Sequence, residues 1–174
     1  MQKHNTQTVH TRHDTRSTAR AVVLVAIGVA LAPITSFPIG IAVVNPTQHF
    51  VNLVGAVLLG PWWAAGIAMV IGIIRNSLGV GSLLAFPGGM IGALLAGYSY
   101  RMLRSSWAAA AGEVVGTGIL GAIIGGLLVA PVFMDAPLTV TALIPSFLGS
   151  SIAGVVIGLP ALAVLRRAGL IGVQ

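Results

Sequence analysis

The sequence predicts an all-α membrane protein, a bundle of six transmembrane helices with both termini in the cytoplasm. Of its 174 residues, 56% are hydrophobic and only 7% are charged, whereas soluble domains carry roughly 25% charged residues. Six apolar runs follow one another along the chain, and basic residues gather at their ends, as they do beside cytoplasmic loops. A soluble globular domain does not fit this composition.

The same composition argues against other classes of protein. The net charge of +6 is typical of a nucleic-acid binder, but the basic residues flank apolar runs instead. The chain has no cysteine, which excludes disulfides and cysteine metal sites. The sequence also lacks paired carboxylates, metal-spaced histidines and nucleotide-binding loops. We therefore expect no enzyme, no metal site and no bound cofactor.

The N-terminal segment is expected to consist of a tail followed by the first helix. Residues 1–18 are polar and predict a disordered cytoplasmic tail. The first apolar run, residues 19–34, could be a secretory signal, because Ala30-Leu31-Ala32 has the pattern of a cleavage site. Pro33 directly after that site is a poor context for cleavage. We therefore expect an uncleaved transmembrane helix.

Proline and glycine mark the boundaries of the next helices. Asn45 is a good N-cap and Pro46 fits the first helical position, so the second helix should run from there to about Gly60. Pro61 opens the third helix in the same way. The third to sixth helices are expected over residues 61–79, 84–102, 106–132 and 140–165. The membrane domain then spans residues 19–167, and residues 168–174 form a short cytoplasmic tail.

The distribution of basic residues gives the orientation. With a cytoplasmic N-terminus, six spans place eight of the nine basic residues on the inner side, as the positive-inside rule requires. The exception is Arg75. Residues 35–45, 79–84 and 132–139 then face outward.

The second helix carries a polar stripe. Its residues lie at positions i, i+3, i+4 and i+7, which share one helix face: Asn45, Gln48, His49 and Asn52. The helix has about 14 residues and is about 21 Å long, whereas the hydrocarbon core is about 30 Å thick. Its polar end must therefore stop below the outer surface, among other helices. Residues 35–44 are apolar enough to fold over a cavity there.

Other polar groups lie near this stripe. Arg75, followed by Asn76, lies about 21 Å from the inner end of its helix, level with the stripe, and its forked donors suit an acidic or strongly hydrogen-bonding ligand. Phe86, beside Pro87, offers an apolar or stacking wall. Glu113 lies about 10 Å below Arg75, so an ion pair between them requires tilted helices.

These groups predict a site for a small polar or heteroaromatic molecule, with Glu113 as a candidate ligand group. A structural role for Glu113 and an interhelical hydrogen-bond network are the alternatives. Small residues also recur every fourth position in the last three helices, which indicates close helix packing. A similar row on the first helix, Ala26 and Ala30, is placed to dock another protein.

The sequence resembles the ThiW family, a group of substrate-binding S components of energy-coupling factor (ECF) transporters. The segments that carry this resemblance cover most of residues 26–125 and read "ALAPITSFPIG", "VNPTQHFVN", "LLGPWW", "GIIRNSLGVGSLLAFPGGMIGALLAG" and "GEVVGTGILGA". The resemblance implies an S-component fold in a prokaryotic plasma membrane. It also implies uptake of a thiamine precursor, the hydroxyethylthiazole moiety, from a pocket beneath the loop between the first two helices.

The resemblance further implies three partner subunits, a transmembrane coupling protein and two ATPases that hydrolyse ATP. The coupling protein would dock on Ala26 and Ala30. Two other functions stay open: a solo ion-coupled carrier that uses Glu113 and His49, and a non-transporting scaffold that uses the small-residue rows as interfaces. An intramembrane enzyme lacks a catalytic set of residues.

Overall fold

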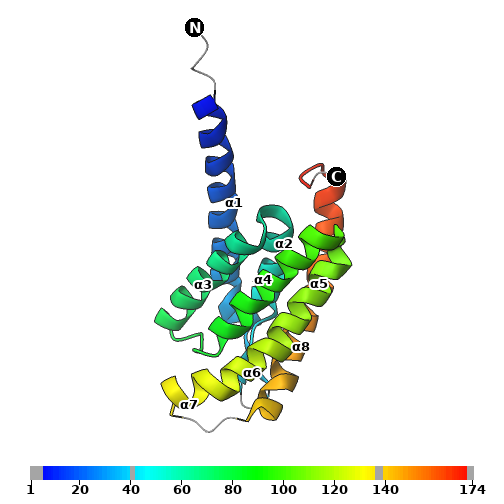
Figure 1. The fold of residues 1–174 in the computed structure, drawn as a ribbon. Coiled ribbons are helices and arrows are strands. Elements are labelled where there is room, and N and C mark those ends of the chain that lie inside the picture. Colours follow the sequence, from blue (N-terminus) through cyan, green and yellow to red (C-terminus); the bar gives the residue numbers. More distant parts are fainter. Residues whose placement is uncertain (1–5, 40–41, 136–138, 172–174) are drawn as a thin grey trace.

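The structure is a computed structural model that describes residues 6–39, 42–135 and 139–171. Within these ranges the chain forms a helical bundle with one short hairpin (Figure 1). The first four helices are α1 (Thr6–Thr35), α2 (Pro46–Leu59), α3 (Pro61–Ser77) and α4 (Ala85–Leu103). A long helical stretch follows, made of α5 (Ser106–Val115), η1 (Gly116–Gly121), α6 (Ala122–Ile124), η2 (Gly125–Val129) and α7 (Ala130–Phe133). The last helix is α8 (Val140–Arg167).

The turns between the helices follow the chemistry of their residues. Asn45 caps α2, because its side-chain oxygen accepts a hydrogen bond of 2.8 Å from the backbone N–H of Gln48. Gly60 separates α2 from α3 with a φ of +93°, a conformation that favours glycine. Pro61 then begins α3. The predicted starts of these two helices are confirmed.

The first helix begins earlier than the sequence predicts. α1 begins at Thr6, so residues 6–18 are helical where we expected a disordered tail. No Gly or Pro interrupts this segment, and extending an existing helix is much easier than nucleating one. This part of α1 projects beyond the other helices (Figure 1). Residues 1–5 of the expected tail lie outside the described residues.

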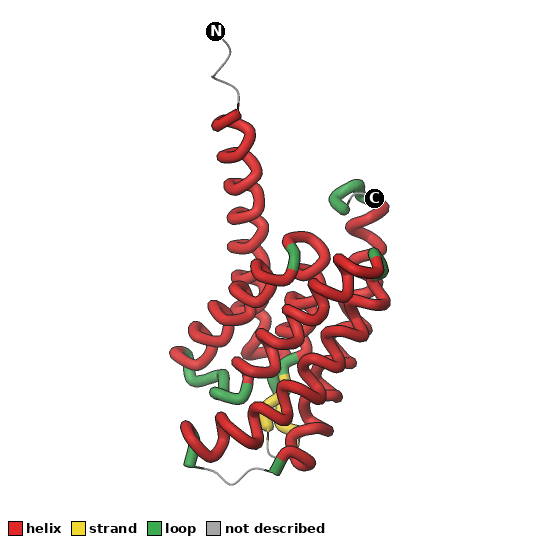
Figure 2. The backbone as a smooth tube through the Cα atoms, in the orientation of Figure 1, coloured by secondary structure: helices red, strands yellow, loops and turns green. Residues whose placement is uncertain are grey.

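A hairpin connects α1 to α2. Strands β1 (Phe37–Ile39) and β2 (Ala42–Val44) pair antiparallel, with Phe37 opposite Val44. The hairpin lies at the opposite end of the bundle from the projecting part of α1 (Figure 2). Its ladder pairs backbone polar groups that a coil would leave unpaired in this apolar setting. The sequence predicts a cover here, but not a pair of strands.

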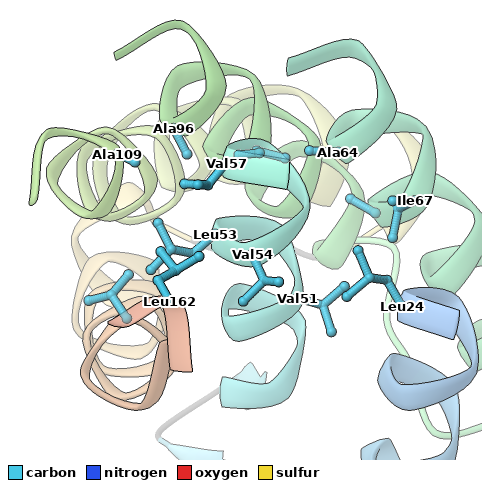
Figure 3. Close-up of a cluster of buried hydrophobic side chains, with 14 of the residues drawn as sticks. Leu24, Val51, Leu53, Val54, Val57, Ala64, Ile67, Ala96, Ala109 and Leu162 are labelled. Carbon is cyan, nitrogen blue, oxygen red and sulfur yellow. The ribbon is translucent and has the colours of Figure 1, made fainter. Parts of the chain in front are cut away.

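The apolar core surrounds the C-terminal half of α2 (Figure 3). Leu53 is fully buried, and Val54 and Val57 lie on the same helix. Their neighbours come from every side of the bundle and include Leu24, Ala64, Ile67, Ala96, Ala109 and Leu162. This core fixes α2 as the central helix, so its other half is held in place as well.

The small-residue rows pack the bundle internally. A Cβ on Gly97 of α4 would lie 2.5 Å from Cα of Pro61, and one on Gly116 would lie 2.8 Å from Cα of Gly92. A Cβ on Gly154 of α8 would lie 2.5 Å from Cβ of His49. Glycine therefore lets α3, α4, η1 and α8 approach their neighbours closely.

Three segments among the described residues are long and apolar enough to cross a membrane. They are Thr15–Thr35, Ser106–Phe133 and Val140–Arg167. The shorter helices α2, α3 and α4 have 14, 17 and 19 residues. A helical bundle in which three segments could span a membrane agrees with the prediction, whereas the count of six spans and the cytoplasmic location of both termini stay predictions.

Candidate functional site

A small cavity lies at the N-terminal end of α2, next to the hairpin. Its volume is about 40 Å³, enough for roughly three water molecules. Strand β2, α2, α3, α4, η1 and α8 all contribute to its walls. The lining residues are Val43, Val44, Asn45, Gln48, His49, Arg75, Ser82, Leu84, Ala85, Gly88, Gly89, Thr117, Ser146, Phe147 and Ser150.

Asn45 joins three elements at the rim of this cavity. Its side-chain Nδ2 donates to Ser36 Oγ over 2.7 Å, just before β1. Its backbone N–H donates to Ser150 Oγ of α8 over 3.0 Å. Together with its capping bond to Gln48, these contacts tie the hairpin, α2 and α8 to one buried residue.

His49, on the cavity wall, and Glu113, behind it, form a buried pair. His49 Nδ1 lies 2.8 Å from Glu113 Oε1, and Asn52 Nδ2 donates to the same oxygen over 3.0 Å. Thr117 Oγ1 is 3.2 Å from that oxygen and 3.0 Å from the carbonyl oxygen of Gly88. Glu113 is fully buried and does not line the cavity.

The depth of each residue explains this pairing. The stripe descends along α2, and Asn52 lies seven residues, about 10 Å, below Asn45. The lower part of the stripe is therefore at the depth of Glu113, whereas Arg75 is level with its upper part. The ion pair between Arg75 and Glu113 that we considered from the sequence is not formed.

Gly92 makes room for the carboxylate. A Cβ at this position of α4 would lie 2.9 Å from both carboxylate oxygens of Glu113 and would collide with Thr117 Oγ1. The small-residue row of α4 therefore serves the polar pair as well as the packing of the helices.

Arg75 reaches the cavity from α3. It is only 3% exposed, and its Nη2 donates to Val80 O over 3.2 Å and to Ser36 Oγ over 3.4 Å. Its Nε is buried without a hydrogen-bond partner. Arg75 forms no ion pair with any of the described residues, so a buried positive charge faces the cavity without a contacting carboxylate.

Four of the eight residues predicted to bind substrate line the cavity, and four do not. Asn45, Gln48, His49 and Arg75 line it, whereas Asn52 and Glu113 lie behind them. The other two residues serve the local fold. The side-chain amide of Asn76 donates to Gly72 O and Ser82 O, and Phe86 packs over Gly72.

Sequence reasoning missed residues on the last two helical stretches. Phe147 supplies the aromatic wall that we expected from Phe86, and Ser146 and Ser150 flank it on α8. Their spacing of four residues had been interpreted only as helix packing. Thr117 follows Glu113 by one helical turn, a spacing that places both on one face. That signal was available in the sequence.

Ala26 and Ala30 lie away from the cavity, on α1. Both are exposed, whereas Gly28 between them is buried against Ile71. The row proposed for docking therefore faces outward. The described residues contain no cluster of His, Cys, Asp and Glu that could hold a metal ion.

Comparison with known proteins gives one result. The family model described as thiamine-precursor transporter protein (ThiW) matches residues 18–168. No curated protein and no solved structure matches the chain. The matched range contains α2, the hairpin, the cavity and the buried His49–Glu113 pair. Because the family model matches most of the length of the chain, the chain belongs to the ThiW family of thiamine-precursor transporter proteins.

Proposed function

We propose that this transporter protein is the S component of an ECF importer and that it captures hydroxyethylthiazole at the outer face of the membrane. The observation that carries the proposal is the polar cavity enclosed by α2, α3, η1 and α8 beneath the hairpin. The family supports transport of a thiamine precursor. The cavity supports capture of a small molecule within this chain.

The chemistry of the walls suits a substituted heteroaromatic ring. Gln48, His49 and Arg75 offer both donors and acceptors, and Phe147 offers an aromatic face. A volume of about 40 Å³ is far below the roughly 300 Å³ of a typical ligand pocket. Ligand entry therefore requires the cover to move, and Ser36 is the residue that holds the hairpin to Asn45 and Arg75.

We also propose six membrane spans with both termini in the cytoplasm of a prokaryote. The projecting N-terminal end of α1 and the C-terminal end of α8 lie at the same end of the bundle (Figure 1). Arg166 and Arg167 end α8 at this side, and exposed Trp62 and Trp63 begin α3 there. Basic residues favour the cytoplasmic side, and tryptophans are common at either membrane interface. The cavity lies toward the opposite end.

Transport in this proposal depends on partner subunits. The exposed row of Ala26 and Ala30 docks the transmembrane coupling protein, and two ATPase subunits hydrolyse ATP. The chain itself needs no cofactor. Replacing both alanines with leucine should prevent co-purification with the coupling protein while ligand binding is retained, because the row lies away from the cavity.

Calorimetric titration of the purified protein tests the ligand site. Hydroxyethylthiazole should bind, and binding should be lost in His49→Ala and Arg75→Ala. Arg166→Ala is the matched control, since this exposed arginine bonds to Ser106 at the other end of the bundle. Selective binding of thiamine or hydroxymethylpyrimidine would overturn the proposed substrate. Absence of binding by folded protein would overturn the capture site.

Labelling of single cysteines tests the orientation. The natural chain has no cysteine, so each introduced thiol reports one position. In intact cells a membrane-impermeant maleimide should label Ser77→Cys at the end of α3 and should leave Ala168→Cys, just after α8, unlabelled. The reverse result would invert the topology.

One observation favours a second candidate function. The buried His49–Glu113 pair has the composition of a proton relay, as used by gradient-driven carriers. Vesicles that contain this protein alone would then accumulate the thiazole when a pH gradient is applied. Accumulation only in the presence of the coupling protein, ATPases and ATP would support the ECF importer instead.

A further inference from the structure

Glu113 acts on the cavity from behind its wall. We propose that this carboxylate sets the hydrogen-bonding polarity of the site, so that the α2 side accepts hydrogen bonds and the Arg75 side donates them. The site then selects a ligand that has a donor at one end and an acceptor at the other. This inference rests on the proposed function of the cavity as a ligand site.

The contact between His49 and Glu113 fixes which ring nitrogen of His49 carries the proton. A carboxylate oxygen accepts hydrogen bonds, so His49 Nδ1, 2.8 Å from Glu113 Oε1, carries the proton. In a neutral imidazole Nε2 is then an acceptor. Nε2 has no hydrogen-bond partner among the described residues, so a ligand can fill this acceptor.

The side-chain amide of Gln48 is oriented by Asn52. Asn52 Nδ2 donates to two acceptors, Glu113 Oε1 at 3.0 Å and Gly89 O at 2.9 Å. Asn52 therefore turns its Oδ1 toward Gln48, which donates to it through Nε2 over 3.1 Å. This leaves Gln48 Oε1 buried without a partner. Glu113 thus orients a second cavity acceptor through Asn52.

Arg75 places a positive charge on another wall of the cavity. The chain has only three acidic residues. Asp14 lies about 30 Å along α1 from Thr35, and Asp135 is exposed after α7. Glu113 is engaged with His49. Arg75 lines the cavity, and its Nε, which can only donate, is buried without a partner.

The acceptors of His49 and Gln48 and the donor of Arg75 define a ligand class. It is a small, neutral molecule with a hydroxyl or N–H donor for His49 and Gln48, and with a ring nitrogen or similar acceptor for Arg75. A heteroaromatic ring that bears a primary alcohol meets both requirements. A quaternised ring such as that of thiamine does not, because its nitrogen has no lone pair and its positive charge would face Arg75.

Ligand analogues test this polarity. We would titrate the protein with hydroxyethylthiazole and with two analogues, its methyl ether and its ethyl analogue. Both analogues lack the hydroxyl donor, and they differ from each other in size. The alcohol should bind at least about tenfold more tightly than both, because it alone supplies a donor to the buried acceptors. In Glu113→Gln this ratio should fall to about threefold or less. Equal binding of all three by the natural protein would overturn the inference and leave the capture site standing.

A second variant guards against misfolding of Glu113→Gln. Gln48→Met replaces glutamine with a side chain of similar length that lacks the amide oxygen. It therefore removes one acceptor from the cavity wall and leaves Glu113 in place. It should also reduce the preference for the alcohol. A full preference in this variant, together with an unchanged preference in Glu113→Gln, would contradict the proposed polarity.

Nuclear magnetic resonance of ¹⁵N-labelled histidine gives a readout that needs no ligand. The chain has four histidines, and replacing His4, His10 and His13 with glutamine leaves His49 as the sole signal. We expect a neutral ring protonated at Nδ1, and a shift toward the Nε2-protonated form in Glu113→Gln. A ring protonated at Nε2 in the natural background would overturn the inference, even if no thiazole binds.

Discussion

The two halves of α2 place different demands on one helix. The N-terminal half buries Gln48, His49 and Asn52, whose polar groups bond into α4 and the α5 stretch. The C-terminal half buries Leu53 and Val57, which pack into the apolar core (Figure 3). Only the polar half borders the cavity. One half therefore stabilises the fold, and the other keeps hydrogen-bonding atoms available.

The two halves of α2 also differ in the free-energy cost of the groups they bury. Each buried polar atom without a partner costs about 1–3 kcal/mol. Among the described residues such atoms are Gln48 Oε1 and Arg75 Nε, on two residues that line the cavity, and Glu113 Oε2 behind it. Such a cost is typical of functional sites, where a ligand supplies the missing partner. Changes in the apolar half should reduce stability and spare binding, whereas changes in the polar half should alter binding.

The largest effect is expected from the apolar half. Leu53→Ala removes a fully buried side chain from the core and should lower the free energy of unfolding by about 2–5 kcal/mol. Leu103→Ala, at the exposed end of α4, should have little effect. Denaturant unfolding in detergent measures both. The affinity of folded Leu53→Ala for the thiazole should stay within about twofold, and a greater loss would mean that the two halves are coupled.

A slightly smaller effect is expected where α4 meets the start of α3. A Cβ at Gly97 would lie 2.5 Å from Cα of Pro61, and backbone cannot move aside easily. Gly97→Ala should therefore lose about 2–3 kcal/mol of stability. Gly66→Ala on α3 is the matched control, because a Cβ there has no neighbour within 4 Å. It should be neutral or stabilise α3 by up to about 1 kcal/mol, and destabilisation in both variants would refute the packing argument.

Local chemistry made much of this fold predictable. Asn45, Pro46, Gly60 and Pro61 have strong preferences at helix ends, and the predicted starts of α2 and α3 are confirmed. The start of α1 was wrong because polar composition says little about whether a segment extends a helix already formed next to it. The hairpin was missed since its strands have only three residues each.

The site was less predictable because it depends on which helices are neighbours. The stripe on α2 follows from spacing along one helix, and so does the level of Arg75. The partner of Glu113 does not, because it depends on how α2 and α5 pack against α4. Predicting its pairing with His49 would have required comparing the depth of Glu113 with that of the lower stripe residues, down to Asn52, and not only with that of Arg75. Phe147 lies 30 residues beyond Thr117, and only the packing of α8 brings it to the cavity.

Asn52 tests the boundary between the two halves. Asn52→Leu preserves approximate size but removes one donor from Glu113 Oε1 and from Gly89 O and the acceptor of Gln48 Nε2, so stability should fall by about 1–2 kcal/mol. The preference for the thiazole alcohol over its ether should also fall, since Gln48 is no longer oriented. Asn76→Leu is the control, because Asn76 bonds only to nearby backbone and lies outside the cavity wall. A loss of ligand preference in both variants would indicate a general loosening of the bundle.

The smallest effect is expected at the hairpin. Ser36 Oγ accepts from Asn45 Nδ2 at 2.7 Å and lies 3.4 Å from Arg75 Nη2, so Ser36→Ala should weaken the closed cover by about 1 kcal/mol or less. Stopped-flow measurements should show ligand release that is up to about fivefold faster, with unfolding almost unchanged. In Ser77→Ala, which loses only a bond to Ile73 O within α3, release should keep its rate. If Ser36→Ala also leaves release unchanged, the hairpin does not hold the ligand, and the polar half of α2 retains it through its own side chains.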